Sequence, residues 1–300
     1  MNDSLPPKPV APLPSDCCGT GCCPCVHDIY EQDMKRWKKL CESLQNCGIS
    51  DELKEKSIYP DRWTEFSIIK IETVTPTCFK YVFKLKENEC LGLDIGQHVM
   101  IKQTKEDRTI SRQYTPVSDI RQKGSFEIII KIYPKGKITQ IIKDWKVGDM
   151  VPLRGPFGSF SYTANSYKHV IMLAAGTGIA PLYQVLRGIA ENEEDETFIT
   201  LLYGSKCFSE ILLRNELLSL CQYWNVNVRH YLSQEDNLTQ KKYNENIIGN
   251  KLSKTDVCQE LKKGLVTATL VLICGTKSFD KDMINASLNA DVPEENIFKF

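Results

Sequence analysis

The 300-residue sequence lacks three features that would each have indicated a class of protein. It has no excess of one charge, because Lys+Arg and Asp+Glu both number 38, whereas proteins that bind nucleic acid through bulk positive charge are strongly basic. Its longest apolar run, Val170–Ala175, is far shorter than the roughly 20 residues that cross a bilayer. Its N-terminus has no basic start followed by an apolar stretch, as a secretory signal would have. We therefore expect an intracellular, cytoplasmic protein with no transmembrane segment and no nucleic-acid partner; peripheral association with a membrane stays open.

Cysteine, in contrast, is abundant, with 13 residues. A reducing compartment is expected, and there clustered cysteines indicate metal ligands or reactive thiols more than disulfides. Such thiolates could hold zinc or an iron–sulfur cluster, with His27 as a further ligand, although no second ligand pair lies at zinc-finger spacing. A redox-sensitive or partner-docking segment is the alternative. The candidate metal ligands fall within nine residues and are Cys17, Cys18, Cys22, Cys23 and Cys25.

The chain divides into three parts, of which residues 1–60 are an N-terminal segment and linker. Five prolines in the first 16 residues predict an extended lead-in, and the cysteine cluster follows it. Apolar residues then recur at alternating intervals of four and three, which predicts one amphipathic helix. These residues are Tyr30, Met34, Trp37, Cys41 and Leu44.

Residues 61–164 show a period of two, which predicts β-strands. Phe79, Tyr81 and Phe83 alternate with other residues, and Phe126–Tyr133 is rich in isoleucine. Glycine-containing breaks separate the strands, and one short helix is expected at Ile138–Trp145. Many short strands in about 100 residues predict a sandwich or a barrel.

Residues 165–300 alternate strands with helices, which predicts a parallel sheet with crossover helices. Val170–Ala175 is continuously apolar, as a strand buried on both faces would be, and a helical spacing begins at Leu182. The polar stretch Gln234–Lys254 is predicted to be a surface excursion. Further strands are expected at Phe198–Tyr203, Val226–Leu232 and Leu270–Ile273, and further helices at Ile211–Cys221 and Phe279–Leu288.

A first motif with chemical potential runs from Arg112 to Ser118. An arginine can bind a pyrophosphate with its forked donors, and Tyr114, two residues on, points the same way from a strand. Hydroxyl groups on Thr115 or Ser118 can hydrogen-bond a ring or a ribityl chain. The alternative is an ordinary strand that ends at Pro116 and carries a surface arginine.

Two further motifs are glycine turns that lead into helices. Tyr133–Thr139 combines a glycine, which allows close backbone approach, with Lys137 and a helix start that favours phosphate. A plain turn with a solvated lysine is its alternative. Gly176-Thr177-Gly178 follows the buried strand, and its helix start can face a dinucleotide phosphate. A fourth motif, Ile273-Cys274-Gly275-Thr276, lies at the carboxyl end of the last apolar strand, where ligands of open α/β sheets bind. A cysteine that only packs in the core is its alternative.

In this order, the four motifs resemble those of the ferredoxin–NADP reductase superfamily, and most closely the NADH–cytochrome b5 reductase family. The resemblance covers roughly Trp63–Phe300 and includes Gly96-Gln97-His98, Arg154-Gly155-Pro156 and the run Ile211-Leu212-Leu213-Arg214. It implies an antiparallel FAD-binding β-barrel over residues 61–164 and an NAD-binding α/β domain over residues 165–300. The cysteine cluster resembles a short oxidoreductase-like N-terminal module.

The resemblance also assigns roles to single residues. It places Gly136, Lys137, Ile138 and Thr139 on the flavin phosphates and Lys131 near NADH. Thr115 and Cys274 are its candidates for the catalytic centre, with Cys274 and Gly275 beside the nicotinamide. The remaining residues that it implies for FAD or the dinucleotide are Arg112, Tyr114, Pro116, Ser118, Tyr133, Gly176, Thr177 and Gly178.

The reaction that the resemblance implies is hydride transfer from NADH to flavin N5, followed by single-electron transfer to a haem protein such as cytochrome b5. The flavin carries the difficult chemistry, so no protein base is required, and the motifs contain no evident acid–base pair. A metal-binding or assembly adaptor that uses a reductase-like scaffold is the alternative function. Two positions depart from the family pattern: Thr276 replaces a proline, and Gln234 replaces an aspartate that favours NADH, with Glu235 and Asp236 following.

Overall fold

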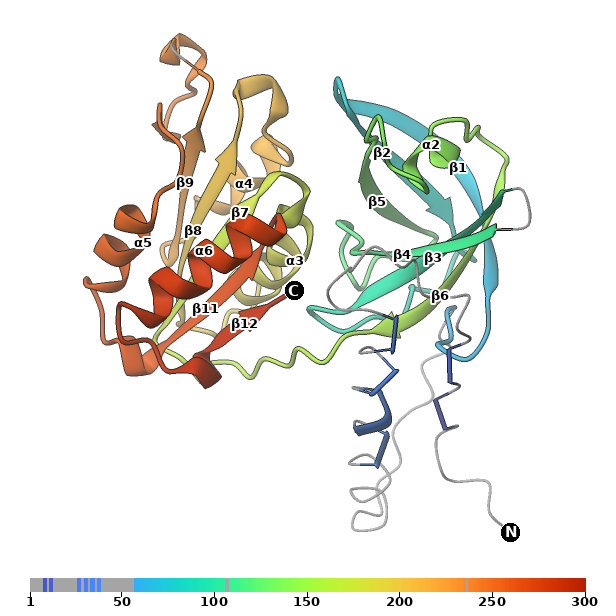
Figure 1. The fold of residues 1–300 in the computed structure, drawn as a ribbon, viewed down its shortest axis with the longest axis horizontal. Coiled ribbons are helices and arrows are strands. Elements are labelled where there is room, and N and C mark those ends of the chain that lie inside the picture. Colours follow the sequence, from blue (N-terminus) through green and yellow to red (C-terminus); the bar gives the residue numbers. More distant parts are fainter. Residues whose placement is uncertain are drawn as a thin grey trace. The chain divides into compact units, whose positions relative to one another are not determined.

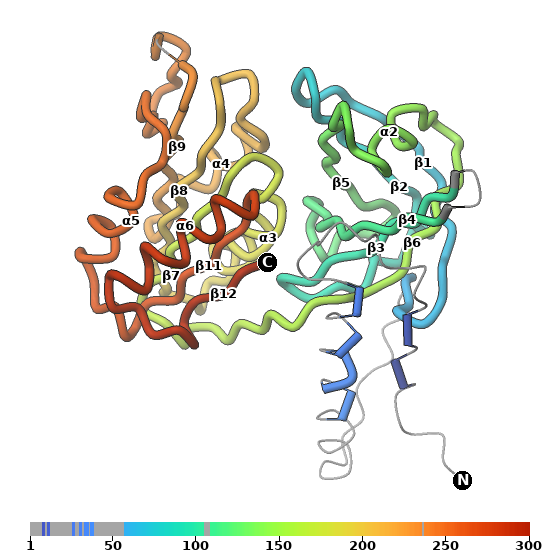
Figure 2. Tube along the Cα trace, viewed as in Figure 1, coloured from blue at the N-terminus to red at the C-terminus, as the bar shows by residue number. Residues whose placement is uncertain are grey.

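The computed structural model of the chain describes residues 57–300 apart from 106, 107 and 236, together with scattered positions between residues 8 and 38 (Figures 1 and 2). It contains two compact units. The barrel unit comprises Met1–Glu72 and Phe79–Phe160, and the nucleotide unit comprises Thr73–Cys78 and Ser161–Phe300. Among the described residues, no helix has the length and apolar character needed to cross a membrane.

In the N-terminal segment, residues 26, 27, 30, 31, 33–35, 37 and 38 are helical. This agrees with the amphipathic helix predicted from the spacing after Tyr30. The rest of that helix and the five clustered cysteines lie outside the described residues.

The barrel unit is built on six strands, whose order in the sheet is β4-β3-β6-β1-β2-β5. The β3–β4, β3–β6 and β1–β6 pairs are antiparallel. One short helix, α2, precedes the last strand, as predicted. The elements are β1 (Thr64–Thr75), β2 (Cys78–Lys84), β3 (His98–Lys105), β4 (Arg108–Tyr114), β5 (Ser125–Lys131), α2 (Thr139–Ile142) and β6 (Met150–Phe157).

The two edge strands of this sheet, β4 and β5, are joined by the segment that follows β4. Pro116 forms a bridge opposite Ile128 of β5, and the Val117 N–H donates to the Glu127 carbonyl at 2.8 Å. The sheet therefore closes on itself, and full closure removes the unpaired edges that an open sheet would expose. The predicted barrel is confirmed, and the predicted flavin motif is the segment that closes it.

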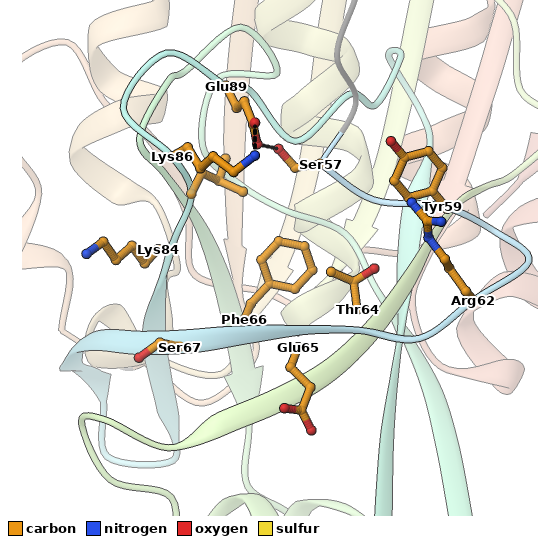
Figure 3. Close-up of a pocket in the computed structure, with 11 residues that line it drawn as sticks. Ser57, Tyr59, Arg62, Thr64, Glu65, Phe66, Ser67, Lys84, Lys86 and Glu89 are labelled. Atoms are coloured by element: carbon orange, nitrogen blue, oxygen red, sulfur yellow. Dashed lines mark hydrogen bonds and ion pairs between the residues drawn. The ribbon is translucent and has the colours of Figure 1, made fainter.

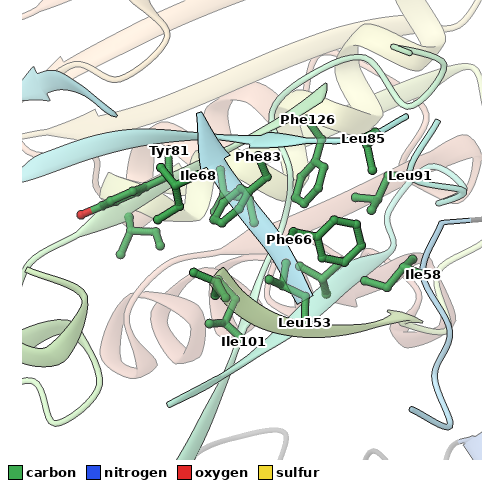
Figure 4. Close-up of a cluster of buried hydrophobic side chains, with 14 of the residues drawn as sticks. Ile58, Phe66, Ile68, Tyr81, Phe83, Leu85, Leu91, Ile101, Phe126 and Leu153 are labelled. Carbon is green, nitrogen blue, oxygen red and sulfur yellow. The ribbon is translucent and has the colours of Figure 1, made fainter. Parts of the chain in front are cut away.

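Alternation along the strands places one row of large side chains inside the barrel (Figure 4). The rings of Phe83 and Phe126 stack with centroids 5.0 Å apart, and Phe66 meets Phe126 edge to face at 5.3 Å. Phe83 and Phe126 are at most 2% exposed. Such aromatic pairs add to the free energy gained by burying apolar area, so this cluster is the main apolar support of the barrel.

We expect Phe126→Ala to lower the free energy of unfolding by about 3–5 kcal/mol, because it leaves a cavity between two aromatic partners. Ile69→Ala is the matched control, since Ile69 is 44% exposed and its truncation should cost less than about 0.5 kcal/mol. Urea unfolding followed by tryptophan fluorescence measures both. Equal losses in the two variants would contradict the assignment of this core.

The nucleotide unit is a parallel sheet of order β10-β9-β8-β7-β11-β12. Helices α3 and α4 contact each other, as do α5 and α6, and Figure 1 shows these two pairs on opposite faces of the sheet. The elements are β7 (His169–Ala175), α3 (Ile179–Ala190), β8 (Phe198–Ser205), α4 (Arg214–Leu220), β9 (Val226–Leu232), β10 (Asn246–Ile248), α5 (Lys254–Leu261), β11 (Thr269–Cys274), α6 (Lys277–Leu288) and β12 (Ile297–Lys299).

Two sequence predictions in this unit were wrong in detail. The helix predicted from Ile211 begins at Arg214, because Leu213 adopts a left-handed conformation with φ of 55° that no helix interior allows. The stretch Gln234–Lys254, predicted to be a surface excursion, contains strand β10, which pairs parallel to β9. Three residues are too few to show a period of two, so this strand gave no sequence signal.

Candidate functional site

The nucleotide site is set by the topology of the parallel sheet. Strands β7 and β11 are neighbours, with Cys274 opposite Ala174, and the chain leaves them in opposite directions, toward β8 and toward β12. Ligands of open α/β sheets bind in the crevice that such a switch creates at the carboxyl ends of the strands. Gly176–Gly178 follows β7 directly and Cys274 ends β11. The structure therefore brings the two predicted dinucleotide motifs together.

These two motifs meet backbone against backbone. A Cβ atom on Gly178 would lie 2.1 Å from the Cys274 carbonyl oxygen and 2.9 Å from the Gly275 nitrogen. A Cβ atom on Gly275 would lie 2.5 Å from Cδ1 of Phe279. Gly176 has a φ of 55° and open space where a side chain would be. Gly178 and Gly275 are therefore required by contacts inside the protein, whereas Gly176 leaves its side of the turn free for a ligand.

Tyr203 on β8 fixes this glycine turn, and sequence reasoning missed it. Its hydroxyl donates to the Gly176 carbonyl at 3.0 Å and accepts from the Leu212 N–H at 3.3 Å. The side chain is fully buried, and burial raises the pKa of the phenol, so the hydroxyl stays protonated and keeps both hydrogen bonds. The sequence signal was a tyrosine that follows the apolar residues Leu201 and Leu202 within a buried strand.

Cys274 presents a neutral thiol. Burial, together with the nearby Asp280 carboxylate, raises the pKa of this thiol to about 12. A thiolate is the reactive form of cysteine, so this side chain suits contact with a ring and not nucleophilic attack. Next to it, Thr276 accepts a hydrogen bond from the Phe279 N–H at 3.3 Å and caps helix α6. The threonine that departs from the family pattern is thus accommodated as a helix cap.

At the carboxyl end of β9, the three candidate ribose-contacting residues have different roles. Gln234 is exposed, and its N–H donates to the Lys206 carbonyl at 2.8 Å. The Glu235 carboxylate accepts from the Phe208 N–H at 3.1 Å, which holds this acid at the edge of the site. Asp236 lies outside the described residues.

We expect Gly178→Ala to weaken NAD+ binding by at least tenfold, because its methyl group would force the turn away from Cys274. Gly204→Ala is the matched control: its Cβ would approach the Ala174 carbonyl oxygen only to 3.6 Å, an ordinary contact. Isothermal titration with NAD+ measures both affinities, and circular dichroism checks the fold. An unchanged affinity in Gly178→Ala would refute the packing argument.

In the barrel unit, the flavin motif brings three predicted residues together. Arg112 and Tyr114 share one face of β4, because they are two residues apart on a strand. Burial raises the pKa of the Tyr114 phenol, the Arg112 charge lowers it in part, and Tyr133 and Tyr81 raise it. These groups are therefore close enough to act on one another. Tyr133 is 49% exposed, so it offers an aromatic face to a ligand.

Ser118 has a structural contact that the sequence did not indicate. It is buried, and its hydroxyl oxygen accepts from the Glu127 N–H at 3.0 Å, next to the bridge that Pro116 makes to β5. The hydroxyl hydrogen remains able to donate to another group. Thr115 lies half-buried between this anchored segment and Tyr114.

The side chain of Thr139 closes the loop from Tyr133 to Thr139. The Thr139 hydroxyl accepts from the Tyr133 N–H at 3.2 Å, and the Gly136 N–H donates to the Tyr133 carbonyl at 3.0 Å. A Cβ atom on Gly136 would lie 2.2 Å from the Thr139 hydroxyl. Within the described residues, the N–H groups of 137–139 have no backbone acceptor, and Lys137 is exposed.

These features fit the diphosphate of FAD. Unpaired N–H groups at a helix start and a lysine favour an anion. Arg112 donates to the Ser111 carbonyl at 2.8 Å through Nη1, which leaves donors of its guanidinium for a phosphate. Lys131 is the last residue of β5, half-buried, two residues before Tyr133. The predicted FAD residues thus lie along the continuous path from β4 through β5 to α2.

His98 is a buried titratable group in the same unit. Burial lowers its pKa to about 4, its Nε2 atom has no hydrogen-bond partner within the described chain, and its ring lies 6.2 Å from that of Phe157. The folded protein therefore holds this histidine neutral. Unfolding restores a pKa near 6.5, so protonation favours the unfolded chain once the pH falls below that value.

Between pH 7 and pH 5, we expect His98 to lower the free energy of unfolding by about 2 kcal/mol, because in this pH range only the unfolded state takes up the proton. His98→Gln should reduce the overall fall by that amount. His230, whose pKa burial also lowers to about 4, remains in the variant and continues to contribute. Urea unfolding of wild type and His98→Gln at pH 7 and pH 5 measures the fall in the free energy of unfolding. An equal fall in the two proteins would contradict the prediction.

Two surface hollows of the barrel unit lie apart from these motifs. One, of about 550 Å³, is lined by Tyr59, Phe66 and Lys84 among others (Figure 3). Along its rim Glu89 accepts hydrogen bonds from Lys86 and Ser57, at 2.7 and 2.8 Å. The second, of about 730 Å³, shares Lys86 and Glu89 with the first. None of the predicted cofactor residues lines either hollow.

The metal prediction concerns the five clustered cysteines, all of which lie outside the described residues. His27 is described and exposed. In the part of the chain that the structure describes, no group of three or more His, Cys, Asp or Glu side chains could hold a metal ion. Metal binding by the cluster therefore stays a prediction.

Comparison with known families assigns all three parts of the chain. Residues 65–162 match the oxidoreductase FAD-binding domain, residues 172–285 the oxidoreductase NAD-binding domain, and residues 3–46 the oxidoreductase-like protein N-terminal family. The human NADH-cytochrome b5 reductase-like protein is 37% identical over 298 residues, which are 98% of this chain and 94% of that protein. The mouse protein of the same name is 36% identical over 303 residues, covering 98% and 95%.

Solved structures show the same fold. The cytochrome b5 reductase domain of Ulva prolifera nitrate reductase has a TM-score of 0.69 at 25% identity, covering 82% of this chain and all of that one. The CS-b5R domains of human Ncb5or match with a TM-score of 0.68 at 24% identity, covering 83% and 71%.

The fold and its two sets of motifs define a flavoprotein oxidoreductase with FAD and NAD as cofactors. Within that class, the chain belongs to the NADH-cytochrome b5 reductase family.

Proposed function

We propose that this protein is an FAD-dependent reductase that takes a hydride from NADH and passes single electrons to a haem protein of the cytochrome b5 type. One observation supports it most strongly: the glycine turn after β7 and Cys274-Gly275 after β11 meet at the switch point of the sheet, where a dinucleotide binds. The NADH-cytochrome b5 reductases that it resembles suggest the acceptor.

In this proposal the bound flavin supplies the redox chemistry, by accepting two electrons with a hydride at N5 and giving them up singly. The barrel holds it through the diphosphate. Arg112, the N–H groups of residues 137–139 and Lys137 would hold the diphosphate by donating hydrogen bonds to it. Tyr114 and Tyr133 contact the flavin as flat apolar surfaces, and the Thr115 and Ser118 hydroxyls hydrogen-bond its polar atoms.

The nucleotide unit orients the dinucleotide in this proposal. Tyr203 fixes the Gly176 carbonyl, so the turn at residues 176–178 is preorganised before the ligand binds. The neutral Cys274 thiol and Gly275 leave an uncharged, close surface for the nicotinamide ring. In the barrel unit, Lys131 is the residue proposed to contact NADH. A hydride transfer needs no protein base, and a thiol with a pKa of about 12 would supply none.

Preference for NADH over NADPH rests on Glu235 in this proposal. The Phe208 N–H fixes its carboxylate at the carboxyl end of β9, where an acid accepts hydrogen bonds from a ribose and repels a 2′-phosphate. Gln234, at the family's aspartate position, carries no charge to do so.

Arg112→Ala should weaken FAD binding by about tenfold to a hundredfold, because it removes charge-assisted hydrogen bonds to the diphosphate. Arg121→Ala is the matched control, since Arg121 is an exposed arginine that pairs with Asp119, and neither residue is among the predicted cofactor residues. The flavin content of the purified proteins and their rate of cytochrome b5 reduction by NADH are measured together.

Wild type and Arg121→Ala should carry FAD and reduce cytochrome b5, whereas Arg112→Ala should lose flavin and recover activity when FAD is added in excess. A wild-type protein that binds metal but no FAD would overturn the proposal in favour of the adaptor function. FAD binding without reduction of cytochrome b5 would overturn the proposed acceptor.

A further inference from the structure

The nucleotide unit exposes a group of aromatic side chains that the redox site does not use. Trp224 is 70% exposed, Phe198 53% and Tyr223 40%. The rings of Phe198 and Trp224 meet edge to face, with centroids 5.3 Å apart and planes at 86°. Aromatic side chains that cluster on a surface mark interaction sites, and tryptophan and tyrosine dominate the binding energy of interfaces.

The backbone beneath these rings is tied by hydrogen bonds. The side chain of the buried Asn225 donates to the Thr197 carbonyl at 2.9 Å, and the Ile199 N–H donates to the Asn225 carbonyl at 2.8 Å. The Val226 N–H donates to the Tyr223 carbonyl at 3.1 Å and closes the turn that carries Trp224. A surface fixed in this way loses little conformational entropy when a partner binds it.

An acidic loop leads into the strand that begins with Phe198. Glu193, Glu194 and Glu196 are exposed, whereas the buried Asp195 between them accepts from the Thr197 N–H at 3.1 Å and the Asn165 N–H at 3.2 Å. Asp195 thus holds the loop in place by its own side chain. Glu196 and Phe198 project to the same side, because the buried Thr197 lies between them in extended chain.

We call this group the aromatic–acidic surface; its residues are Phe198, Tyr223, Trp224, Glu193, Glu194 and Glu196. It lies at the amino ends of β8 and β9, which are neighbours in the sheet (Figure 1). The dinucleotide motifs lie at the carboxyl ends of the strands. Strand β8 runs from Phe198 to Ser205, which at about 3.3 Å per residue separates the two edges by roughly 23 Å.

The charges on this surface select the chemistry of its partner. Three exposed carboxylates lie in the loop that leads into Phe198, and the exposed Lys168 neighbours Phe198 through the hydrogen bond between the Phe198 N–H and the Lys168 carbonyl. A lysine or arginine is attracted both by carboxylates and by the face of a tryptophan ring.

We propose that the aromatic–acidic surface docks a basic segment of a partner protein, with Trp224 as the central anchor and the three glutamates as its charged border. Docking at this edge leaves the dinucleotide edge of the same sheet open, so it is compatible with turnover. The proposal does not depend on the redox function, because every residue that carries it lies outside the cofactor motifs.

The full-length protein tests this with a fluorescently labelled synthetic peptide of alternating lysine and leucine, and with the same peptide carrying glutamate in place of lysine. Binding is measured by anisotropy. We expect Trp224→Ala and the triple change Glu193→Gln, Glu194→Gln, Glu196→Gln each to weaken binding of the basic peptide by at least tenfold. Tyr243→Ala, which removes an 89% exposed aromatic residue elsewhere on the unit, and Glu87→Gln should bind like wild type.

Circular dichroism and the rate of NADH oxidation of each variant confirm that the fold and the redox site are intact. Equal affinity of wild type and both surface variants for the basic peptide would overturn the proposal, as would equal affinity of wild type for the two peptides. Sedimentation and vesicle binding exclude other occupants. A dimer, or attachment to phosphatidylserine vesicles, that Trp224→Ala abolishes would assign the surface to a second copy or to a membrane and overturn the basic partner.

Discussion

The close contact between Gly178 and the Cys274–Gly275 backbone is the constraint on which the nucleotide site depends. It exists because β7 and β11 lie side by side while the chain leaves them in opposite directions. With 2.1 Å between a hypothetical Gly178 Cβ and the Cys274 carbonyl oxygen, neither turn can move without the other. Tyr203 fixes the far side of the same turn. The site is therefore formed largely by backbone, which main-chain packing positions before any ligand binds.

In the barrel unit, backbone contacts also position the residues of the flavin motif. The segment after β4 closes the sheet through Pro116, Val117 and Ser118, so the strand end that carries Arg112 and Tyr114 is held from both sides. Residues required for closing the barrel and residues proposed to hold FAD thus share one stretch of seven amino acids. A substitution in this stretch is expected to affect folding and cofactor binding together. Arg112→Ala separates the two effects, because the Arg112 side chain takes little part in closing the barrel.

Much of the fold and of the candidate site could be predicted from the sequence. The apolar run at Val170–Ala175 and the alternation around Phe83 indicated the two sheets, because burial on two faces or on one gives each strand a distinct period. Glycine turns indicated the dinucleotide site. Tyr203 could not be found, because its role depends on a partner 27 residues away along the chain. Strand β10 and the left-handed Leu213 are set by tertiary contacts that leave no local pattern.

The proposed function depends on one half-reaction, the reduction of bound FAD by NADH, and anaerobic titration measures this reaction most directly. Successive additions of NADH to the purified flavoprotein should bleach the visible absorbance of the flavin until one equivalent has been added. Glu235→Ala should need a higher NADH concentration for the same bleaching, because it loses a hydrogen bond to the ribose, and should gain the ability to bleach with low concentrations of NADPH. A bound flavin that stays oxidised in the presence of excess NADH would contradict the central claim.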